Sequence, residues 1–232
     1  MWPALILAVA AQFDHAHAAW SLQLGEFVHD GAVDYAGWKK EQLALDGYLR
    51  QLVVVKKEEF AAFTRPEQTA FLIDAYNAYT VRLILNHFPL GSIRSIGLLP
   101  GAAFRRSFIP LLGEELSLND LEDRLRERGD PRIHFALVCA SQSCPKLRAT
   151  AYRATDLEAQ LDTAAREFLG DPRKNRFEPG AAHLSSIFKW YGDDFSKAAG
   201  SLAAYLGRYT KDPLPKDVRI DYLDYDWSLN ER

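Results

Sequence analysis

The sequence contains only two cysteines among its 232 residues and no long block of basic residues. Because the net charge is −3 as well, nothing predicts a nucleic-acid surface or a polybasic membrane anchor. Beyond the N-terminal region, no apolar run approaches the ~20 residues that cross a bilayer, so we expect no stable membrane span. Internal repeats and low-complexity segments are also absent from the sequence.

Several motifs of cofactor and metal enzymes are missing too. The chain has no phosphate-binding or dinucleotide-binding glycine pattern, no GxSxG turn, no CxxC pair and no HExxH. Glu122, His134 and the two cysteines are suitable metal ligands by type, but they follow no established metal-binding spacing. We therefore predict neither a cofactor nor a metal. A thiol-disulfide oxidoreductase is disfavoured for the same lack of a CxxC pair.

What is present is ordinary globular composition, with 48% hydrophobic and 25% charged residues, enough for one sizeable core. The first 18 residues differ, because residues 2–11 are apolar and Ala16-His17-Ala18 is a small-x-small tripeptide. This pattern resembles a secretory signal peptide cleaved after Ala18, although no Lys or Arg precedes the apolar run. The alternative is a plain N-terminal helix. We predict a signal peptide over 1–18, one domain over 19–232 and a periplasmic or secreted protein.

Irregularly alternating helices and strands predict an α+β fold, a single helix-rich domain with a small, mainly antiparallel sheet. The strongest element is a helix from the capping box Thr64-Arg65-Pro66-Glu67 to about Asn86. A second capping box, Thr155-Asp156-Leu157-Glu158, predicts a helix ending near Gly170. Ile133 to Val138 is typical of a buried strand. We further expect helices over about 37–54, 117–128, 188–195 and 202–209, hairpins over 108–116 and 176–187, and a strand over 218–222.

Both cysteines and His134 lie within eleven residues, after which Ala140 to Ser143 is typical of a turn. A strand that delivers a thiol and an imidazole to a loop suits thiol chemistry, and it equally suits a small disulfide. In an oxidising compartment two cysteines often pair. A bridge between Cys139 and Cys144 would close a very short loop, which favours a labile bond.

Five segments together carry a resemblance to a known family. They are Phe71 to Ala78, Leu118 to Glu122, His134 to Leu137 with Cys139 and Cys144-Pro145, Ile187 to Tyr191, and Tyr222 to Tyr225. In combination they resemble the DUF547 family, a domain of unknown function found in exported bacterial proteins and in plants. The likeness covers about residues 30–228.

The resemblance implies which residues carry a shared role. It points to Tyr76 and Asn77 of an Asn-x-Tyr-Asn motif, whose first Asn is replaced here by Asp74. It also points to a helical Glu, matched by Glu122, and to the His-Phe-x-Leu-x-Cys pattern, matched by His134 and Cys139. Plant-type members carry Ser at the position of Cys144. The resemblance therefore favours Cys139 for chemistry common to the family.

These residues suggest a thiol-dependent hydrolase or acyl transferase acting on an amide or ester, with an unidentified cell-envelope substrate. Cys139 would be the nucleophile, His134 the base and Glu122 the group that orients it. The turn amides of 140–143 would form an oxyanion hole. The candidate substrate-binding residues are Asn77, Tyr76 and Cys144, and Asn77 is alternatively the group that orients His134.

Strand geometry opposes the Cys139–His134 pair, because residues five apart in a strand point to opposite faces. The two side chains meet only if the backbone bends, and otherwise Cys144, or another imidazole from His87 or His183, completes the site. The alternative function is a non-catalytic binding or scaffold domain with a structural cysteine pair. In that case Tyr76 and Asn77 satisfy a buried network, and residues 189–191 pack in the core.

Overall fold

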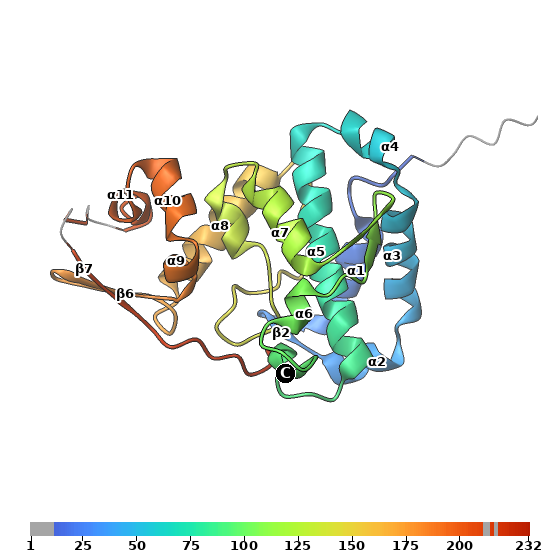
Figure 1. The fold of residues 1–232 in the computed structure, drawn as a ribbon, viewed down its shortest axis with the longest axis horizontal. Coiled ribbons are helices and arrows are strands. Elements are labelled where there is room, and N and C mark those ends of the chain that lie inside the picture. Colours follow the sequence, from blue (N-terminus) through green and yellow to red (C-terminus); the bar gives the residue numbers. More distant parts are fainter. Residues whose placement is uncertain (1–11, 211–213, 216–217) are drawn as a thin grey trace, which may run out of the picture.

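The longest helix, α5 (Arg65–His87), stands at the centre of the molecule (Figure 1). The computed structural model describes residues 12–210, 214–215 and 218–232. Thr64 caps α5 in the expected capping box with Glu67, since each accepts a hydrogen bond from the backbone of the other. Nearly every residue of α5 from Thr69 to Leu85 is buried, because other helices cover it on several sides.

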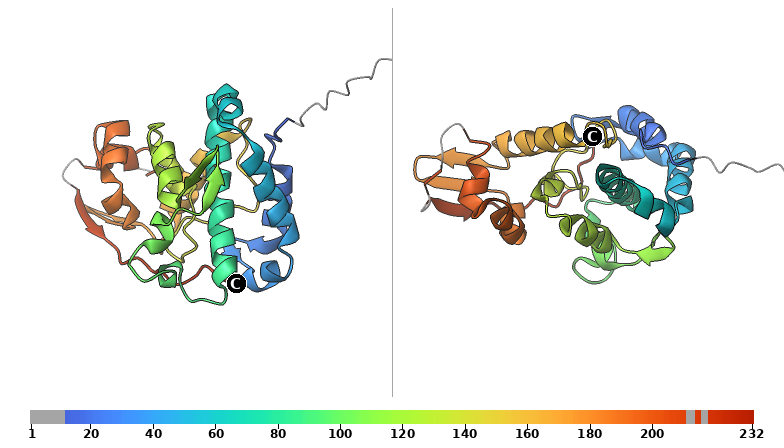
Figure 2. Two further views of the ribbon diagram at one scale, coloured as in Figure 1. Left: turned by 45° about the vertical axis from the view of Figure 1, so that its right-hand side comes forward. Right: turned by 90° about the horizontal axis from the view of Figure 1, so that it is seen from above.

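Three N-terminal helices lie on one side of α5, where the second and third contact it and the first packs on those two, and α7 packs on the other side (Figure 2). The N-terminal helices are α1 (Ala18–Phe27), α2 (Tyr35–Lys40) and α3 (Leu43–Val54). The helix α7 is Leu118–Arg126, and Ser117 caps it in a capping box with Asp120. Shorter helices complete this half: α4 (Lys57–Ala62), the 3₁₀ helix η1 (Ile93–Ser95) and α6 (Ala102–Arg105).

The strands form three small sheets. Two are antiparallel pairs, β1 (Val28–His29) with β2 (Ala32–Val33) and β3 (Ile109–Leu111) with β4 (Glu114–Leu116). The third contains β5 (Arg176–Glu178), β6 (Ala181–Leu184) and β7 (Arg219–Tyr222), with β6 parallel to β7. Because the strand pairs are mostly antiparallel and helix dominates, the predicted α+β class is confirmed.

A second, aromatic cluster fills the half of the molecule that contains the three-stranded sheet (Figure 1). Its helices are α8 (Leu157–Gly170), α9 (Ile187–Trp190), α10 (Gly192–Ala199) and α11 (Leu202–Leu206). Phe135 inserts its ring among Phe168, Phe188 and Phe195, with ring centroids 5.2–5.9 Å away. Phe135 lies just before residues 139–144, which we call the cysteine loop. Its packing therefore connects this loop to the second cluster.

The predicted strand over Ile133 to Val138 is wrong. The 3₁₀ helix η2 spans Pro131–Phe135, and residues 136–139 continue as irregular backbone. The side chain of Asn77 replaces a strand partner here: its Nδ2 donates to the carbonyl of Ala136 (3.0 Å) and its Oδ1 accepts from the amide of Val138 (2.9 Å). The buried amide and carbonyl are therefore satisfied without a sheet.

Three other expectations need correction. The predicted helix over 37–54 is two helices, α2 and α3, separated at residues 41–42. The predicted helix over 188–195 is also two helices, α9 and α10, separated at Tyr191. The helix ending at Gly170 is confirmed, but its predicted capping box is not formed. Its N-cap residue Asp156 makes no capping hydrogen bond and instead forms an ion pair with Arg153.

Residues 12–18 belong to the folded body, whereas the apolar part of the predicted signal peptide, residues 1–11, lies outside the described residues. Phe13 packs against Phe71, with ring centroids 5.2 Å apart. His17 is buried, and its Nδ1 lies 2.7 Å from the hydroxyl of Tyr48. Cleavage after Ala18 would remove these contacts. None of the described helices is long and apolar enough to cross a membrane.

Candidate functional site

A cavity of about 560 Å³ opens between α7, α9, the cysteine loop and the chain after β7. Its wall combines aromatic rings with a few polar groups. The residues that line it are Tyr76, Gly101, Phe104, Arg105, Asn119, Glu122, His134, Leu137, Cys139, Cys144, Pro145, Ile187, Trp190, Tyr191, Tyr225 and Trp227. We call it the aromatic cavity. Its size suits a small ligand or the end of a polymer.

Cys139 and Cys144 form a disulfide in the wall of the aromatic cavity. Cys144 is buried and Cys139 is partly exposed. The backbone turns sharply after Cys139, because Ala140 has φ 58°, in the left-handed region that a residue with a Cβ seldom adopts. The amide of Cys139 donates to the Sγ of Cys144 (2.9 Å), so the loop is closed by a hydrogen bond as well as by the covalent bond.

The chain after β7 returns to this loop and covers it. Ser141 pairs with Leu229 in an isolated antiparallel bridge, and the amide of Gln142 donates to the carbonyl of Ser228 (2.9 Å). The hydroxyl of Tyr225 lies 3.3 Å from the Sγ of Cys139 and 3.2 Å from the Sγ of Cys144. One phenol thus contacts both sulfur atoms from the cavity side.

His134 pairs with an acid that the sequence analysis did not select. Its Nε2 lies 2.9 Å from the Oδ2 of Asp194, which also accepts from the Nε of Arg126 (2.7 Å). Burial lowers the pKa of His134 to about 4, although Asp194 opposes the shift, so the imidazole is neutral near pH 7. Burial alone would raise the pKa of Asp194, but hydrogen bonds from Arg126 and His134 outweigh it and lower that pKa.

Glu122 interacts with Tyr191, not with His134, among the described side chains. Burial raises the pKa of Glu122, against an opposing hydrogen bond from Tyr191. The ring of Tyr191 stacks on the imidazole of His134 with centroids 4.0 Å apart. Burial, followed by the charge of Glu122, raises the pKa of Tyr76. The site thus places a carboxyl group whose ionisation is disfavoured beside neutral phenol groups.

Aromatic rings form the outer part of the wall. Trp190 is 46% exposed, and its ring lies 4.8 Å from that of Tyr225 and 5.9 Å from that of Trp227. The expectation that residues 189–191 pack in the core is therefore wrong for Trp190, whereas Tyr191 lines the cavity and also packs against the second cluster. Large exposed rings beside a hollow supply flat apolar contact area for a ligand.

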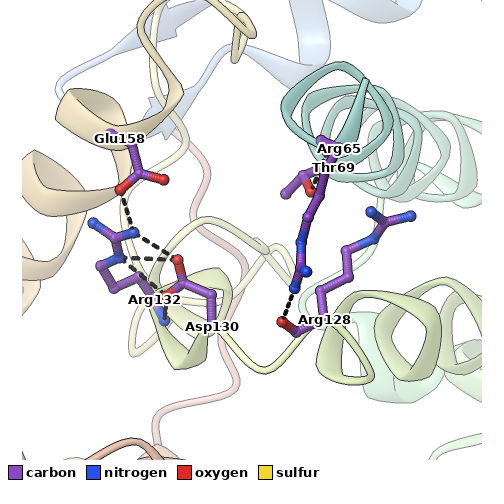
Figure 3. Close-up of polar contacts among 6 residues, drawn as sticks. All are labelled: Arg65, Thr69, Arg128, Asp130, Arg132 and Glu158. Carbon is purple, nitrogen blue, oxygen red and sulfur yellow. Dashed lines mark hydrogen bonds and ion pairs between the residues drawn. The ribbon is translucent and has the colours of Figure 1, made fainter. Parts of the chain in front are cut away.

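Ion pairs hold η2, and therefore His134, in place. Arg132 binds Asp130 and also Glu158 at the start of α8, each through an N–O distance of 2.6 Å (Figure 3). In the same view, the guanidinium of Arg65 in α5 donates to the carbonyl of Arg128, just after α7. These contacts link the segment before His134 to helices on both sides.

Five of the six sequence-predicted residues line the aromatic cavity, namely Tyr76, Glu122, His134, Cys139 and Cys144. Asn77 does not line it, because both ends of its amide bind the backbone of residues 136 and 138. No hydrogen bond joins Cys139 to His134 among the described residues. No group of three or more His, Cys, Asp or Glu side chains within the described ranges is arranged to hold a metal ion.

Sequence reasoning missed Asp194, Arg126 and the rings of Trp190, Tyr225 and Trp227. Asp194 lies 60 residues after its partner His134, on a helix whose sequence carries no motif, so no local signal marked it. Tyr225 and Trp190 belong to segments that carry the family likeness, and the sequence suggests core packing for Trp190 but no role for Tyr225.

Comparisons with known proteins give one match. A family model described as "Protein of unknown function, DUF547" matches residues 60–169, which include Tyr76, Glu122, His134 and both cysteines. No curated protein and no solved structure matches the chain. The matched region ends before α9, so Asp194 and the rings after residue 186 lie outside it.

Proposed function

The chain belongs to the DUF547 family, whose function is unknown, and we propose that its aromatic cavity is the substrate site of a thiol-dependent hydrolase or acyl transferase. The observation that carries the proposal is convergence. Glu122 comes from α7, while His134 and Cys139 lie five residues apart in a later segment, yet all three line one cavity. Titratable groups with shifted pKa values in a cavity are typical of a functional site.

The reaction begins with reduction of the Cys139–Cys144 disulfide. A dithiol reductant supplies two electrons and two protons, which yields two thiols and an oxidised reductant. The Cys139 thiol then gives its proton to the neutral imidazole of His134. Asp194 stabilises the imidazolium that results, which is the part that Glu122 was expected to play. The hydroxyls of Tyr225 and Ser141, each 3.3 Å from the Sγ of Cys139, can donate to the thiolate.

The thiolate attacks the carbonyl carbon of an amide or ester, and the leaving group takes the proton back from His134. Water or an acceptor then cleaves the thioester and frees Cys139. Burial raises the pKa of Glu122, so its carboxyl holds a proton to higher pH than an exposed one and can donate to the acyl oxygen. Export, and with it a cell-envelope substrate, is supported by the N-terminal pattern and by a disulfide that suits an oxidising compartment.

Alkylation of the folded, reduced protein with iodoacetamide near neutral pH tests the proposal. We expect Cys139 to react and the oxidised protein to be inert. Cys144→Ser, which cannot form the disulfide, should react without reductant. The matched variant Cys139→Ser should also abolish hydrolysis of a panel of thioesters and activated esters. Thiols that stay unreactive in the folded, reduced protein would sink the proposal.

A second candidate is a binding domain in which the disulfide is structural. It is favoured by the hydroxyl of Tyr225 and the amide of Cys139, which both contact the bonded sulfur atoms. On this reading, Cys139→Ser and His134→Ala lower the melting temperature and alter no turnover. Loss of ester hydrolysis with an unchanged melting temperature would decide against it.

A further inference from the structure

The turn between η1 and α6 contains two solvent-exposed leucines, Leu98 and Leu99. Leu98 is fully exposed and Leu99 is 67% exposed, although neither side chain is polar. Gly97 and Gly101 bracket the turn with φ values of 89° and 73°, a conformation that favours glycine. A Cβ at Gly97 would lie 2.6 Å from the Cβ of Ala102, so the glycine also allows close packing. The turn is thus built to present its leucines outward.

Within the stretch of sequence that contains the turn, the charged side chains are all basic. From Tyr76 to Gly113 the sequence contains no Asp or Glu. Arg94, Arg105 and Arg106 are all exposed in this stretch. Arg105 donates to the carbonyl of Pro100 (2.6 Å), which holds one guanidinium beside the leucines. Two apolar tips flanked by arginines with no nearby acid in the sequence suit an anionic surface with an apolar interior.

The same surface is continuous with the mouth of the aromatic cavity. Arg105 lines both that cavity and a shallow hollow formed with Leu98 and Leu99. Phe104 is 6.2 Å from the ring of Trp227, and the guanidinium of Arg94 lies 5.3 Å above that ring. Tryptophan rings beside arginines are characteristic of protein surfaces that sit at the level of lipid headgroups.

We propose that this surface, defined by Arg94, Leu98, Leu99, Arg105 and Arg106, docks on an anionic lipid bilayer. The leucines enter the acyl region, the guanidinium groups bind lipid phosphates and the mouth of the aromatic cavity faces the membrane. The proposed contact is peripheral and reversible. Docking does not depend on the thiol chemistry, and it adds the direction from which a substrate arrives.

Co-sedimentation of the full, oxidised protein with vesicles tests the docking. The vesicles are made of phosphatidylcholine alone, or of equal parts phosphatidylcholine and phosphatidylglycerol. The loop variant combines Leu98→Ser with Leu99→Ser. Its matched control combines Leu43→Ser with Val54→Ser, two residues of α3 that are 84% and 70% exposed. Arg106→Gln probes charge at a residue that is exposed and lines no part of the aromatic cavity.

We expect binding to the anionic vesicles and little to the neutral ones. The loop variant should bind at least about tenfold more weakly, since two apolar side chains no longer leave water. Arg106→Gln should bind about fivefold more weakly, because each arginine near the surface contributes about that factor. The control should bind like the wild type. Equal binding to both vesicle types, or equal loss in loop variant and control, would overturn the proposal.

The assay is separate from the proposed chemistry. If the protein binds anionic vesicles while its reduced thiols stay unreactive, the docking proposal stands and the hydrolase proposal fails. If the thiols react but the protein stays in the supernatant with every vesicle type, the hydrolase proposal stands and the docking proposal fails. Recovery of the wild type as a concentration-dependent oligomer without vesicle binding would identify the leucines as a protein contact and would also overturn the proposal.

Discussion

The buried pair of Asp74 and His17 shows how strongly the surroundings of one residue set its charge. Burial raises the pKa of Asp74 well above its ordinary value, and burial lowers the pKa of His17 to about 4. Burial therefore disfavours the charged form of both side chains. The Oδ1 of Asp74 accepts from the amide of Tyr152 (3.2 Å). Asp74 thus acts as a buried hydrogen-bond acceptor at the position where the sequence resemblance implies Asn.

Replacing Asp74 with Asn should stabilise the protein, and more at high pH than at low pH. A carboxyl whose pKa is raised on folding contributes stability that is full below its unfolded pKa, near 4, and is lost as pH rises towards the folded value. Asn cannot ionise and escapes this loss. We expect the melting temperature of Asp74→Asn to exceed that of the wild type more at pH 8 than at pH 5. A difference independent of pH would contradict this reading.

His17 predicts the opposite trend on the acid side. Its pKa falls from 6.5 to about 4 on folding, so the unfolded chain binds the proton first. The stability contributed by neutral His17 is full above pH 6.5 and is lost as pH falls towards 4, by about 3 kcal/mol in all. Urea unfolding of His17→Gln should depend less on pH in this window than unfolding of the wild type. Part of the dependence remains, because the pKa of His134 shifts in the same direction.

Among the elements, helices whose start signals are local could be predicted well from the sequence. The Thr64 capping box and the Ser117 start signal give α5 and α7 to within about two residues, because the capping contacts reach only three residues ahead. The segment 133–138 could not be predicted, because the group that satisfies its backbone is a side chain 61 residues earlier. An apolar run alone does not distinguish a strand from such a segment.

Asn77 should therefore matter for the folding of η2 and the cysteine loop more than for ligand binding. Asn77→Ala leaves the buried carbonyl of residue 136 and the buried amide of residue 138 unpaired, at a cost of roughly 1–3 kcal/mol each. Urea unfolding should show the loss. The matched control is Asn86→Ala, an exposed position in the last turn of the same helix, where we expect almost no change. Equal effects at both positions would refute the role of Asn77.

At the scale of the whole molecule, residues 12–18 complete the hydrophobic core around α5. Phe13 is 8% exposed and meets Phe63 as well as Phe71, while His17 fills a buried position beside Tyr48. A chain that begins at Ala19 loses these contacts, whereas one that begins at Gln12 keeps them. We expect the free energy of unfolding of the shorter chain to be about 2–3 kcal/mol lower, since burying one Phe side chain alone contributes that much. Equal stability of the two chains would show that the segment is dispensable.

The site as a whole could be predicted only in part. The family likeness and the cysteine spacing identify five residues that the fold brings to one cavity. Asp194 and Trp227 lie far along the chain and carry no motif of their own. Asp194 reaches His134 because α10 packs near η2. Trp227 reaches the cavity because the chain after β7 folds back across the cysteine loop. Tertiary packing of this kind has no local signature.

The return of that last segment also sets an order of events during synthesis. The hydroxyl of Ser143 accepts a hydrogen bond from the amide of Asp226, which is synthesised 83 residues later. This contact therefore forms only after Asp226 has been made. The helical core around α5 uses residues made much earlier. A ribosome that stops before codon 225 therefore releases a chain that has nearly all the residues of that core, Leu229 excepted. The cysteine loop of that chain lacks the cover supplied by Tyr225. Integrity of the loop thus reports that translation ran through this segment.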